Sequence, residues 1–370
     1  METQRNITDL PLEVLDLIFN NIDIRMDQIQ LAQAHEYLGE AFAYHSRDTY
    51  KRMYIGAFSP LNSYALLLRT CGSSVRELSY DVGSEDLGKL VGKYCHQLES
   101  IEFRVTASSA HLMESLILLL KGRDSIKSIQ IIMERDVPGT VLQGLTEFPQ
   151  LRNLDFRQNA GDAVYEIRKL INLEELKIKS SSYHEQVNIF DICAPMKKLR
   201  CLTVFNINIL SHGKEDAPLM ACPALEELTL QQCLLSAELP HFPRLTSMTL
   251  ASCACNIKHL VCATILKNAN SLEELDIDCH PSPFDGDNFL EVLRACKKLR
   301  ELCEPIRKVP IYRAFVFQIV EILQENGWTP ENPFTLWVFD RPKMKWIKRL
   351  VAQSSCPGII DLNVVKIISK

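Results

Sequence analysis

The chain has 370 residues, and 46% of them are hydrophobic, so it can bury more apolar surface than one compact domain usually holds. Its 41 basic and 46 acidic residues give a formal net charge of -5, which excludes a field across the whole molecule that attracts nucleic acid or anionic lipid. The N-terminus has no apolar run of signal-peptide length, and the longest aliphatic stretch, Leu116 to Leu120, is too short to span a bilayer. We therefore expect a soluble protein of the cytoplasm or nucleus, with no membrane partner.

The first predicted element is a short amphipathic helix that begins near Leu10. Thr8 or Asp9 can cap it, and Pro11 suits a first helical turn because the missing N–H is not needed there. The apolar residues on one face of this helix are Val14, Leu15, Ile18, Phe19 and Ile22. A second helix is predicted near residues 27–34 and a third near 37–50. A unit of this size is too small to be very stable alone, so we expect it to pack against a partner or against the rest of the chain.

The stretch from Leu10 to Leu15 (LPLEVL), followed by Ile18 and Phe19, resembles the opening of an F-box, and residues 30–34 (QLAQA) resemble its second half. The resemblance covers residues 7 to about 50. It implies that three helices bind the Skp adaptor of SCF-type ubiquitin ligases and, through it, a cullin scaffold. The residues that match adaptor-binding positions are Leu10, Pro11, Val14, Leu15, Ile18, Phe19, Ile29, Leu31, Ala32 and Leu38.

A six-residue pattern with apolar residues at positions one, four and six, Leu-x-x-Leu-x-Leu, recurs nine times in full and once truncated, at spacings of 20 to 28 residues. Its matches begin at Val75, Leu98, Ile126, Leu151, Leu173, Leu199, Leu225, Leu245, Leu272 and Leu299. The Leu-x-Leu alternation is typical of a strand with one buried face, and helical patterns lie between the matches. The stretch Cys222 to Cys233 also resembles the cysteine-containing leucine-rich repeat.

These elements predict an α/β fold in which a three-helix, F-box-like segment precedes a right-handed leucine-rich-repeat solenoid. In this horseshoe, short parallel strands form the concave face and helices form the convex face. We place the helical segment at residues 1–52, the solenoid of about ten repeats at 53–305, and degenerate repeats with a C-terminal cap at 306–370. The cap contains a predicted helix near 312–326, two predicted strands at 333–338 and 359–364, and all three tryptophans. Covering the open end of the core is their expected role, with a dedicated binding surface as the alternative.

The strand residues that alternate with the buried ones form the predicted substrate-binding face. The candidates are Arg157, Glu175, Lys177, Lys179, Phe205, Glu227, Gln231, Glu274, Asp276, Asp278 and Glu301. Basic character in the middle gives way to acid at the end, where the last four residues are expected to form one acidic patch. A basic peptide or protein face suits such a patch, and a solvated face without a partner is the alternative.

No P-loop, dinucleotide fingerprint, zinc-protease motif or nucleophile elbow is present, so we expect a non-catalytic protein without cofactor or metal. Cys253, Cys255, His259 and Cys262 include the ligand types that zinc prefers, but Cys253 occupies the cysteine position of its own repeat. The thirteen cysteines are spread along the chain and fit reduced thiols, mostly in the core. The basic stretch 341–349 fits the solvated side of a terminal helix better than a nucleic-acid site.

The sequence thus predicts a substrate-recognition subunit of an SCF-type ubiquitin ligase, whose substrate is a protein that the sequence does not identify. A protein-interaction scaffold without a ubiquitin role is the alternative. An enzyme that uses an unrecognised cysteine site is a third, weaker reading.

Overall fold

The computed structural model describes residues 6–56, 61–134, 137–158, 162–180, 186–210, 222–255, 257, 259–280, 285–303, 311–338 and 341–364. The chain divides into two units, Met1–Glu166 and Ile167–Lys370, and this division falls within the predicted repeat region. The predicted boundary at residues 305–306 lies outside the described residues. Among the described residues, no helix is both long and apolar enough to cross a bilayer.

The first unit begins with a 3-10 turn, Ile7–Asp9, and three helices: α1 (Leu12–Asn20), α2 (Arg25–Ala34) and α3 (Glu36–Ser46). Pro11 directly precedes α1 and is not in its first turn, and Asp9 caps the 3-10 turn by accepting a hydrogen bond from the Asn6 backbone N–H at 2.8 Å. The helices pack through the rings of Phe19 and Phe42, whose centroids are 5.6 Å apart. The third helix is shorter than predicted because a second 3-10 turn, Thr49–Lys51, follows it.

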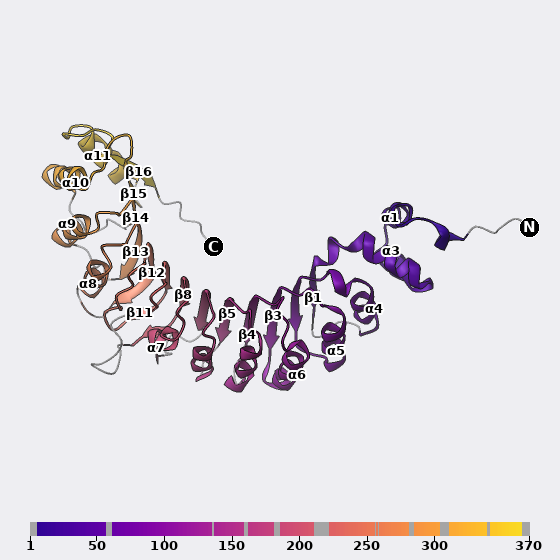
Figure 1. Cartoon of the computed structure of the whole chain (residues 1–370). Coiled ribbons are helices and arrows are strands. Elements are labelled where there is room, and N and C mark those ends of the chain that lie inside the picture. The colour runs from indigo at the N-terminus through magenta and orange to yellow at the C-terminus, as the bar shows by residue number, and fades with distance from the viewer. Residues whose placement is uncertain are drawn as a thin grey trace, which may run out of the picture. The chain divides into compact units, whose positions relative to one another are not determined.

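Five parallel strands follow in the first unit, in the order of the sequence. They are β1 (Arg52–Ile55), β2 (Glu77–Asp81), β3 (Ser100–Val105), β4 (Ser128–Met133) and β5 (Asn153–Gln158). The helices α4 (Leu61–Cys71), α5 (Glu85–Tyr94) and α6 (Ala110–Leu120), with the 3-10 helix Gly139–Glu147, connect the strands and cover one of their faces (Figure 1). A further 3-10 helix, Asp162–Lys169, spans the division between the units.

The second unit repeats this arrangement with eight strands of three to nine residues. They are β6 (Glu175–Ser180), β8 (Cys201–Phe205), β10 (Glu227–Gln231), β12 (Ser247–Cys255), β13 (Glu274–His280), β14 (Glu301–Cys303), β15 (Phe334–Val338) and β16 (Ile360–Val364). Two-residue strands β7 (Gln186–Val187), β9 (Asn208–Ile209) and β11 (Leu234–Leu235) form a side row. The helices are α7 (Ile189–Cys193), α8 (Leu260–Lys267), α9 (Gly286–Ala295), α10 (Arg313–Glu325) and α11 (Arg341–Val351).

The repeat pattern accounts for the core of each unit. In β10, Leu228 and Leu230 are fully buried, while Glu227, Thr229 and Gln231 lie on the other face. Each leucine has an apolar register partner on the next strand, as Leu228 has in Met248. Stacked rows of this kind bury apolar surface that one repeat leaves open to water. The predicted α/β class and the short parallel strands, one from each repeat, are confirmed.

The cysteines and the C-terminal elements also follow expectation. All thirteen cysteines lie within the described ranges as free thiols, and most are buried in the core. Helix α10 and strands β15 and β16 lie within one residue of their predicted positions, and Gly327 after α10 has a φ of +90°. Trp328 is buried, but Trp346 is 48% exposed, so the tryptophans do not all cover the core.

Candidate functional site

The strand residues that alternate with the buried ones form what we call the open face of each unit. The structure places all the predicted substrate-binding residues on this face. In the first unit the open face carries Arg157 on β5. In the second it carries Glu175, Lys177 and Lys179 on β6, Phe205 on β8, Glu227 and Gln231 on β10, Glu274, Asp276 and Asp278 on β13, and Glu301 on β14.

Carboxylates on the open face of the first unit have arginine partners. Arg52 Nε lies 2.9 Å from Glu77 Oε2, and Arg157 Nη2 lies 2.9 Å from Asp155 Oδ2. Arg104 Nε lies 3.1 Å from Glu102 Oε1 and 3.6 Å from Asp81 Oδ1. The hydrogen bond to Glu102 raises the pKa of the Arg104 guanidinium. This surface is therefore close to neutral in charge, and its polar groups already bind one another.

The basic residues at the start of the second unit behave differently. Lys179 and Phe205 are register partners on β6 and β8, and the Lys179 Nζ lies 4.4 Å from the centroid of the Phe205 ring. A cation in this position is attracted by the negative face of the ring. Lys177 and Lys179 are both exposed and available to an acidic partner.

The acidic patch predicted from the sequence is confirmed as a cluster. Glu274 and Glu301 are register partners on β13 and β14, and Asp276 and Asp278 follow Glu274 on the same face. Asp278 accepts a hydrogen bond from Ser252 Oγ at 3.1 Å. The carboxylates of Glu274, Asp276 and Glu301 have no basic side chain within ion-pair distance in the part of the chain that the structure describes. This end of the open face is therefore strongly negative.

The patch forms one side of a pocket of about 380 Å³. Its lining residues are Ser247, Thr249, Glu274, Leu275, Asp276, Glu301, Cys303 and Trp337. Cys303 on β14 and Trp337 on β15 are register partners, so the later strands supply a thiol and an indole wall next to the carboxylates. We refer to this feature as the acidic pocket. Cys303 was missed although it follows Glu301 by two residues on the same strand, because the repeat match at Leu299 was truncated at Leu302. Trp337 was missed because no spacing rule links it to Glu274 across the insertion that separates β14 from β15.

Ionisation in the acidic pocket favours cation binding over nucleophilic chemistry. Burial raises the pKa of the Asp276 carboxyl, and a nearby cation would stabilise its charged form. Burial and the neighbouring carboxylates raise the pKa of the Cys303 thiol well above its usual range. A thiol that stays protonated at neutral pH is a poor nucleophile.

The cysteine and histidine residues considered as zinc ligands do not form a metal centre. Cys253 is buried, and its thiol donates to the Leu230 carbonyl at 3.2 Å. Cys262 is buried in α8, while His259 is exposed at the start of that helix. Within the described ranges no group of three or more metal-binding side chains was found.

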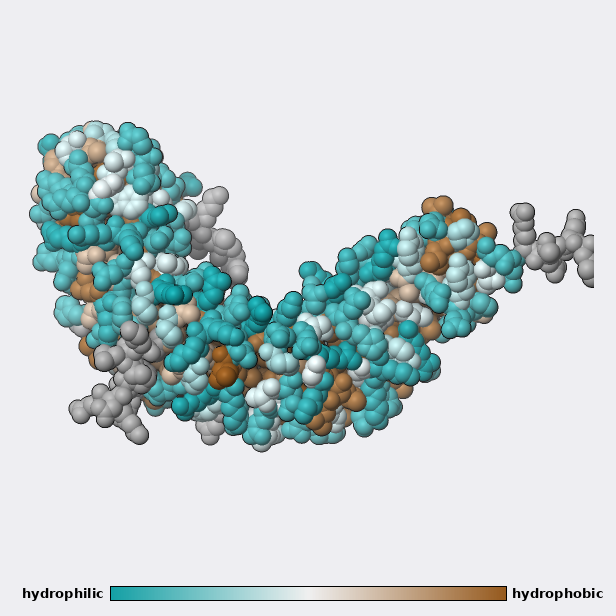
Figure 2. All heavy atoms as spheres, in the orientation of Figure 1, coloured by the Kyte–Doolittle hydropathy of each residue, from teal (hydrophilic) through white to brown (hydrophobic). Residues whose placement is uncertain are grey.

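The N-terminal helices carry an exposed apolar surface, seen as a brown area near α1 in Figure 2. The exposed apolar residues are Ile7, Val14, Leu17, Ile24 and Met26. We call these residues the N-terminal apolar surface. Isolated apolar residues are ordinary on protein surfaces, whereas contiguous apolar patches are typical of interaction sites.

The ten predicted adaptor-binding residues divide between the inside and the outside of the helical unit. Pro11 and Val14 are exposed, and Leu10, Ile18 and Leu31 are half-buried. The remaining five are buried in the bundle: Leu15, Phe19, Ile29, Ala32 and Leu38. Leu17 was missed because it lies off the face of α1 that the helical spacing marks. Ile24 and Met26 were missed because they precede the predicted start of the second helix near residue 27.

Comparison with known proteins adds little. No family model and no curated protein matches the chain. One matching solved structure is that of the Toll–Spatzle complex, described as a molecular hub in Drosophila development and innate immunity. It has 13% sequence identity and a TM-score of 0.29, and the match covers 72% of this chain and 45% of that chain. This chain therefore spans less than half of that chain's length.

Proposed function

We propose that the chain is a non-catalytic substrate-recognition subunit of an SCF-type ubiquitin ligase. In this proposal the N-terminal helices bind the Skp adaptor, and the open face of the repeats binds a substrate protein. The observation that carries the proposal is a small helical unit with an exposed apolar surface, placed directly before an array of parallel repeat strands. The F-box resemblance of residues 7 to about 50 gives that surface a partner.

Adaptor docking fits the division of residues in the helical unit. Buried residues such as Leu15 and Phe19 hold the helices together, and Pro11, Val14 and Leu17 on the outside are free to meet a partner. Covering an apolar side chain yields roughly 25 cal/mol for each Å² removed from water. Several such side chains on one surface supply the apolar centre that stable protein interfaces have.

The acidic pocket is the proposed substrate contact, and its chemistry favours a basic segment of the substrate. A lysine or arginine side chain there would lie between Glu274, Asp276 and Glu301, which lack other cationic partners in the described part of the chain. The indole of Trp337 offers an aromatic face to the same cation. The protein would then act by proximity, raising the effective concentration of substrate near a conjugating enzyme.

Co-purification of the full chain with the Skp adaptor tests the first half of the proposal. The double variant V14E/L17E places two charges on the N-terminal apolar surface and is expected to abolish adaptor binding. Leu118→Glu is the matched control, because Leu118 is 66% exposed on α6 in the same unit. If the unmodified chain retains neither adaptor nor cullin, or if V14E/L17E binds as well as L118E, adaptor docking is wrong.

A scaffold without a ubiquitin role remains the second candidate, and one observation favours it. Five of the ten residues that match adaptor-binding positions are buried within the helical unit, so they contribute to its stability without any partner. The two candidates differ in the fate of the bound protein. A partner captured by the acidic pocket should accumulate in cells that express V14E/L17E if the chain serves a ligase, and should keep its abundance if the chain is a scaffold.

A further inference from the structure

The tetrapeptide Lys-Lys-Leu-Arg occurs twice in the second unit, at residues 197–200 and 297–300. Each copy lies between a helix and the next strand: the first follows α7 and precedes β8, and the second follows α9 and precedes β14. In both copies the leucine is buried and the three basic residues are exposed. The two copies therefore present the same side chains at the same position of two repeats.

In the first copy the chain itself binds the basic groups. Lys197 Nζ donates to the Ala194 carbonyl at 2.8 Å, and Lys198 Nζ donates to Asn172 Oδ1 at 3.2 Å. Arg200 Nη2 lies 2.6 Å from Glu226 Oε2. No pocket is needed to explain these residues.

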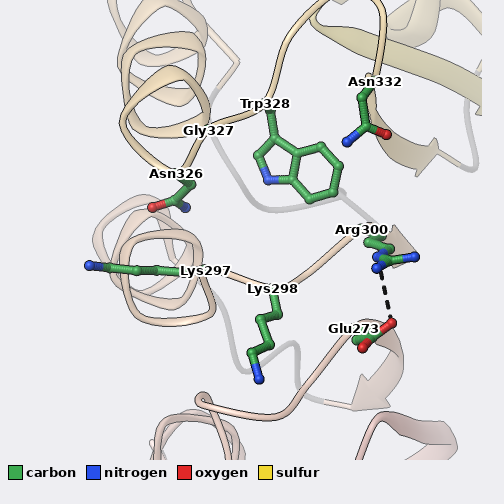
Figure 3. Close-up of a pocket in the computed structure, with 8 residues that line it drawn as sticks. All are labelled: Glu273, Lys297, Lys298, Arg300, Asn326, Gly327, Trp328 and Asn332. Atoms are coloured by element: carbon green, nitrogen blue, oxygen red, sulfur yellow. Dashed lines mark ion pairs between the residues drawn. The ribbon is translucent and has the colours of Figure 1, made fainter.

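In the second copy the same residues line a pocket of about 350 Å³. The lining residues are Glu273, Lys297, Lys298, Arg300, Asn326, Gly327, Trp328 and Asn332, and we call this the edge pocket (Figure 3). Lys297 and Lys298 have no side-chain hydrogen bond or ion pair among the described residues. Arg300 Nε lies 3.5 Å from Glu273 Oε2, the contact dashed in Figure 3. Three cations and one carboxylate give the lining a formal charge of +2.

Asn326, Gly327 and Trp328, which follow α10, form one wall of the edge pocket. Gly327, with a φ of +90°, ends α10 and turns the chain so that the Trp328 backbone N–H donates to the Leu323 carbonyl at 3.0 Å. Asn326 Nδ2 donates to the Leu293 carbonyl at 2.8 Å, which fixes the turn against α9. Figure 3 shows the Trp328 indole between Asn326 and Arg300.

The Trp328 side chain adds a donor without an acceptor. It is 9% exposed, its ring packs edge-on against Phe334, and its Nε1 has no hydrogen-bond partner. A buried N–H without an acceptor is uncommon in folded proteins. The indole Nε1 is itself buried from solvent, so the charged groups that the edge pocket offers to a ligand are the two unpaired lysines and Arg300, against the single carboxylate of Glu273.

We propose that the edge pocket binds a phosphate-class oxyanion, either free or carried on a phosphorylated side chain. Ammonium and guanidinium groups form short, charge-assisted hydrogen bonds with such anions. Cations after a helix also offset the negative end of its dipole, but that role is common to both copies and requires no pocket. The proposal does not depend on adaptor docking and stands if the chain is a scaffold.

The three tryptophans provide the test, because the ¹⁵N-labelled full chain has three indole N–H resonances. The variant Trp328→Phe identifies the resonance of Trp328. Titration with inorganic phosphate and with O-phosphoserine, each against sodium chloride at equal ionic strength, is expected to shift that resonance saturably. Tighter binding of O-phosphoserine would assign a peptide-borne group, and tighter binding of inorganic phosphate would assign the free anion.

The repeated tetrapeptide supplies matched variants. K297Q/K298Q should weaken binding by about tenfold or more, since two charge-assisted hydrogen bonds are lost, whereas K197Q/K198Q should leave it unchanged. Glu273→Gln keeps both lysines, removes the carboxylate of the lining and should tighten binding, so the test survives if K297Q/K298Q does not fold. The proposal is wrong if neither ligand gives a saturable shift, if sodium chloride reproduces the shift, or if both lysine pairs matter equally.

Discussion

Glu274 on β13 and Glu301 on β14 are register partners on adjacent parallel strands, and no basic side chain in the described part of the chain neutralises either one. Like charges at facing positions on neighbouring strands destabilise a sheet. On the open face of the first unit, Glu102 instead has Arg104 at 3.1 Å. The unneutralised pair at the end of the second unit therefore costs stability that a bound cation would restore.

Replacing Glu301 by Gln should raise the free energy of unfolding by about 0.2–1 kcal/mol, because repulsion of Glu274 is removed. Denaturant unfolding of the full chain measures the change. Glu102→Gln is the control and should not raise the free energy of unfolding, because it removes the partner of Arg104. A loss of stability in E301Q would show that favourable contacts of Glu301 outweigh its repulsion of Glu274.

The sequence predicted the strands well because their signal is local. Leu225, Leu228 and Leu230 alternate with polar residues, and β10 forms where this alternation lies. Strand β1 was missed because the 3-10 turn Thr49–Lys51 precedes Met53 and Ile55, and no leading leucine marks the strand. The two-residue strands of the side row carry no periodic signal and exist through their pairing alone.

The candidate site was predictable only in part. The shared spacing of Glu274, Asp276 and Glu301 within their repeats places them together, and the register bears this out. The indole of Trp337 joins them through an insertion whose length does not follow the repeat period, so its position depends on tertiary packing. For the N-terminal helices, both faces of α1 are apolar, and packing decides that Phe19 is buried and Leu17 is 61% exposed.

Leu230→Ala should cost about 2–5 kcal/mol, because the side chain is fully buried and its loss leaves a cavity that the neighbouring strands fill only partly. Thr229→Ala, one residue away on the open face, should change stability by less than about 0.5 kcal/mol. Thermal unfolding followed by circular dichroism compares the two. Equal effects would contradict the assignment of faces on β10.

Phe19→Ala and Val14→Glu should separate folding from docking in the N-terminal helices. Phe19 is fully buried against Phe42, so its truncation should cost about 3–5 kcal/mol. Val14 is exposed, and its replacement should change stability by about 0.5 kcal/mol or less. Hydrogen exchange of the α1 amides reports the difference, and strong loss of protection in V14E would place Val14 in the core.

Gly327→Ala should destabilise the chain by about 1–2 kcal/mol through its backbone alone, because φ is +90° and no atom lies within 4 Å of the added methyl group. Gly88→Ala is the opposite case. Its φ is helical within α5, the added methyl group meets Leu116 at an ordinary 3.9 Å, and a gain of about 0.4–1 kcal/mol is expected. Thermal unfolding of both variants measures these changes. If G327A is as stable as the unmodified chain, the turn before Trp328 relaxes without cost.

Asp276→Asn should stabilise the chain at neutral pH, with a gain that disappears in acid. Burial raises the pKa of the Asp276 carboxyl above its ordinary 3.8, so the folded chain binds this proton more tightly than the unfolded chain. Above the raised pKa the buried charge lowers the free energy of unfolding by its full amount. As pH falls through the raised pKa toward the ordinary value, the carboxyl binds a proton and this loss disappears. Denaturant unfolding of both proteins from pH 7 to pH 4 measures the difference. If the stability of D276N relative to the unmodified chain instead increases toward acid, a favourable contact lowers the pKa of Asp276. The carboxylate would then already have a partner within the chain, and the acidic pocket would not need a bound cation.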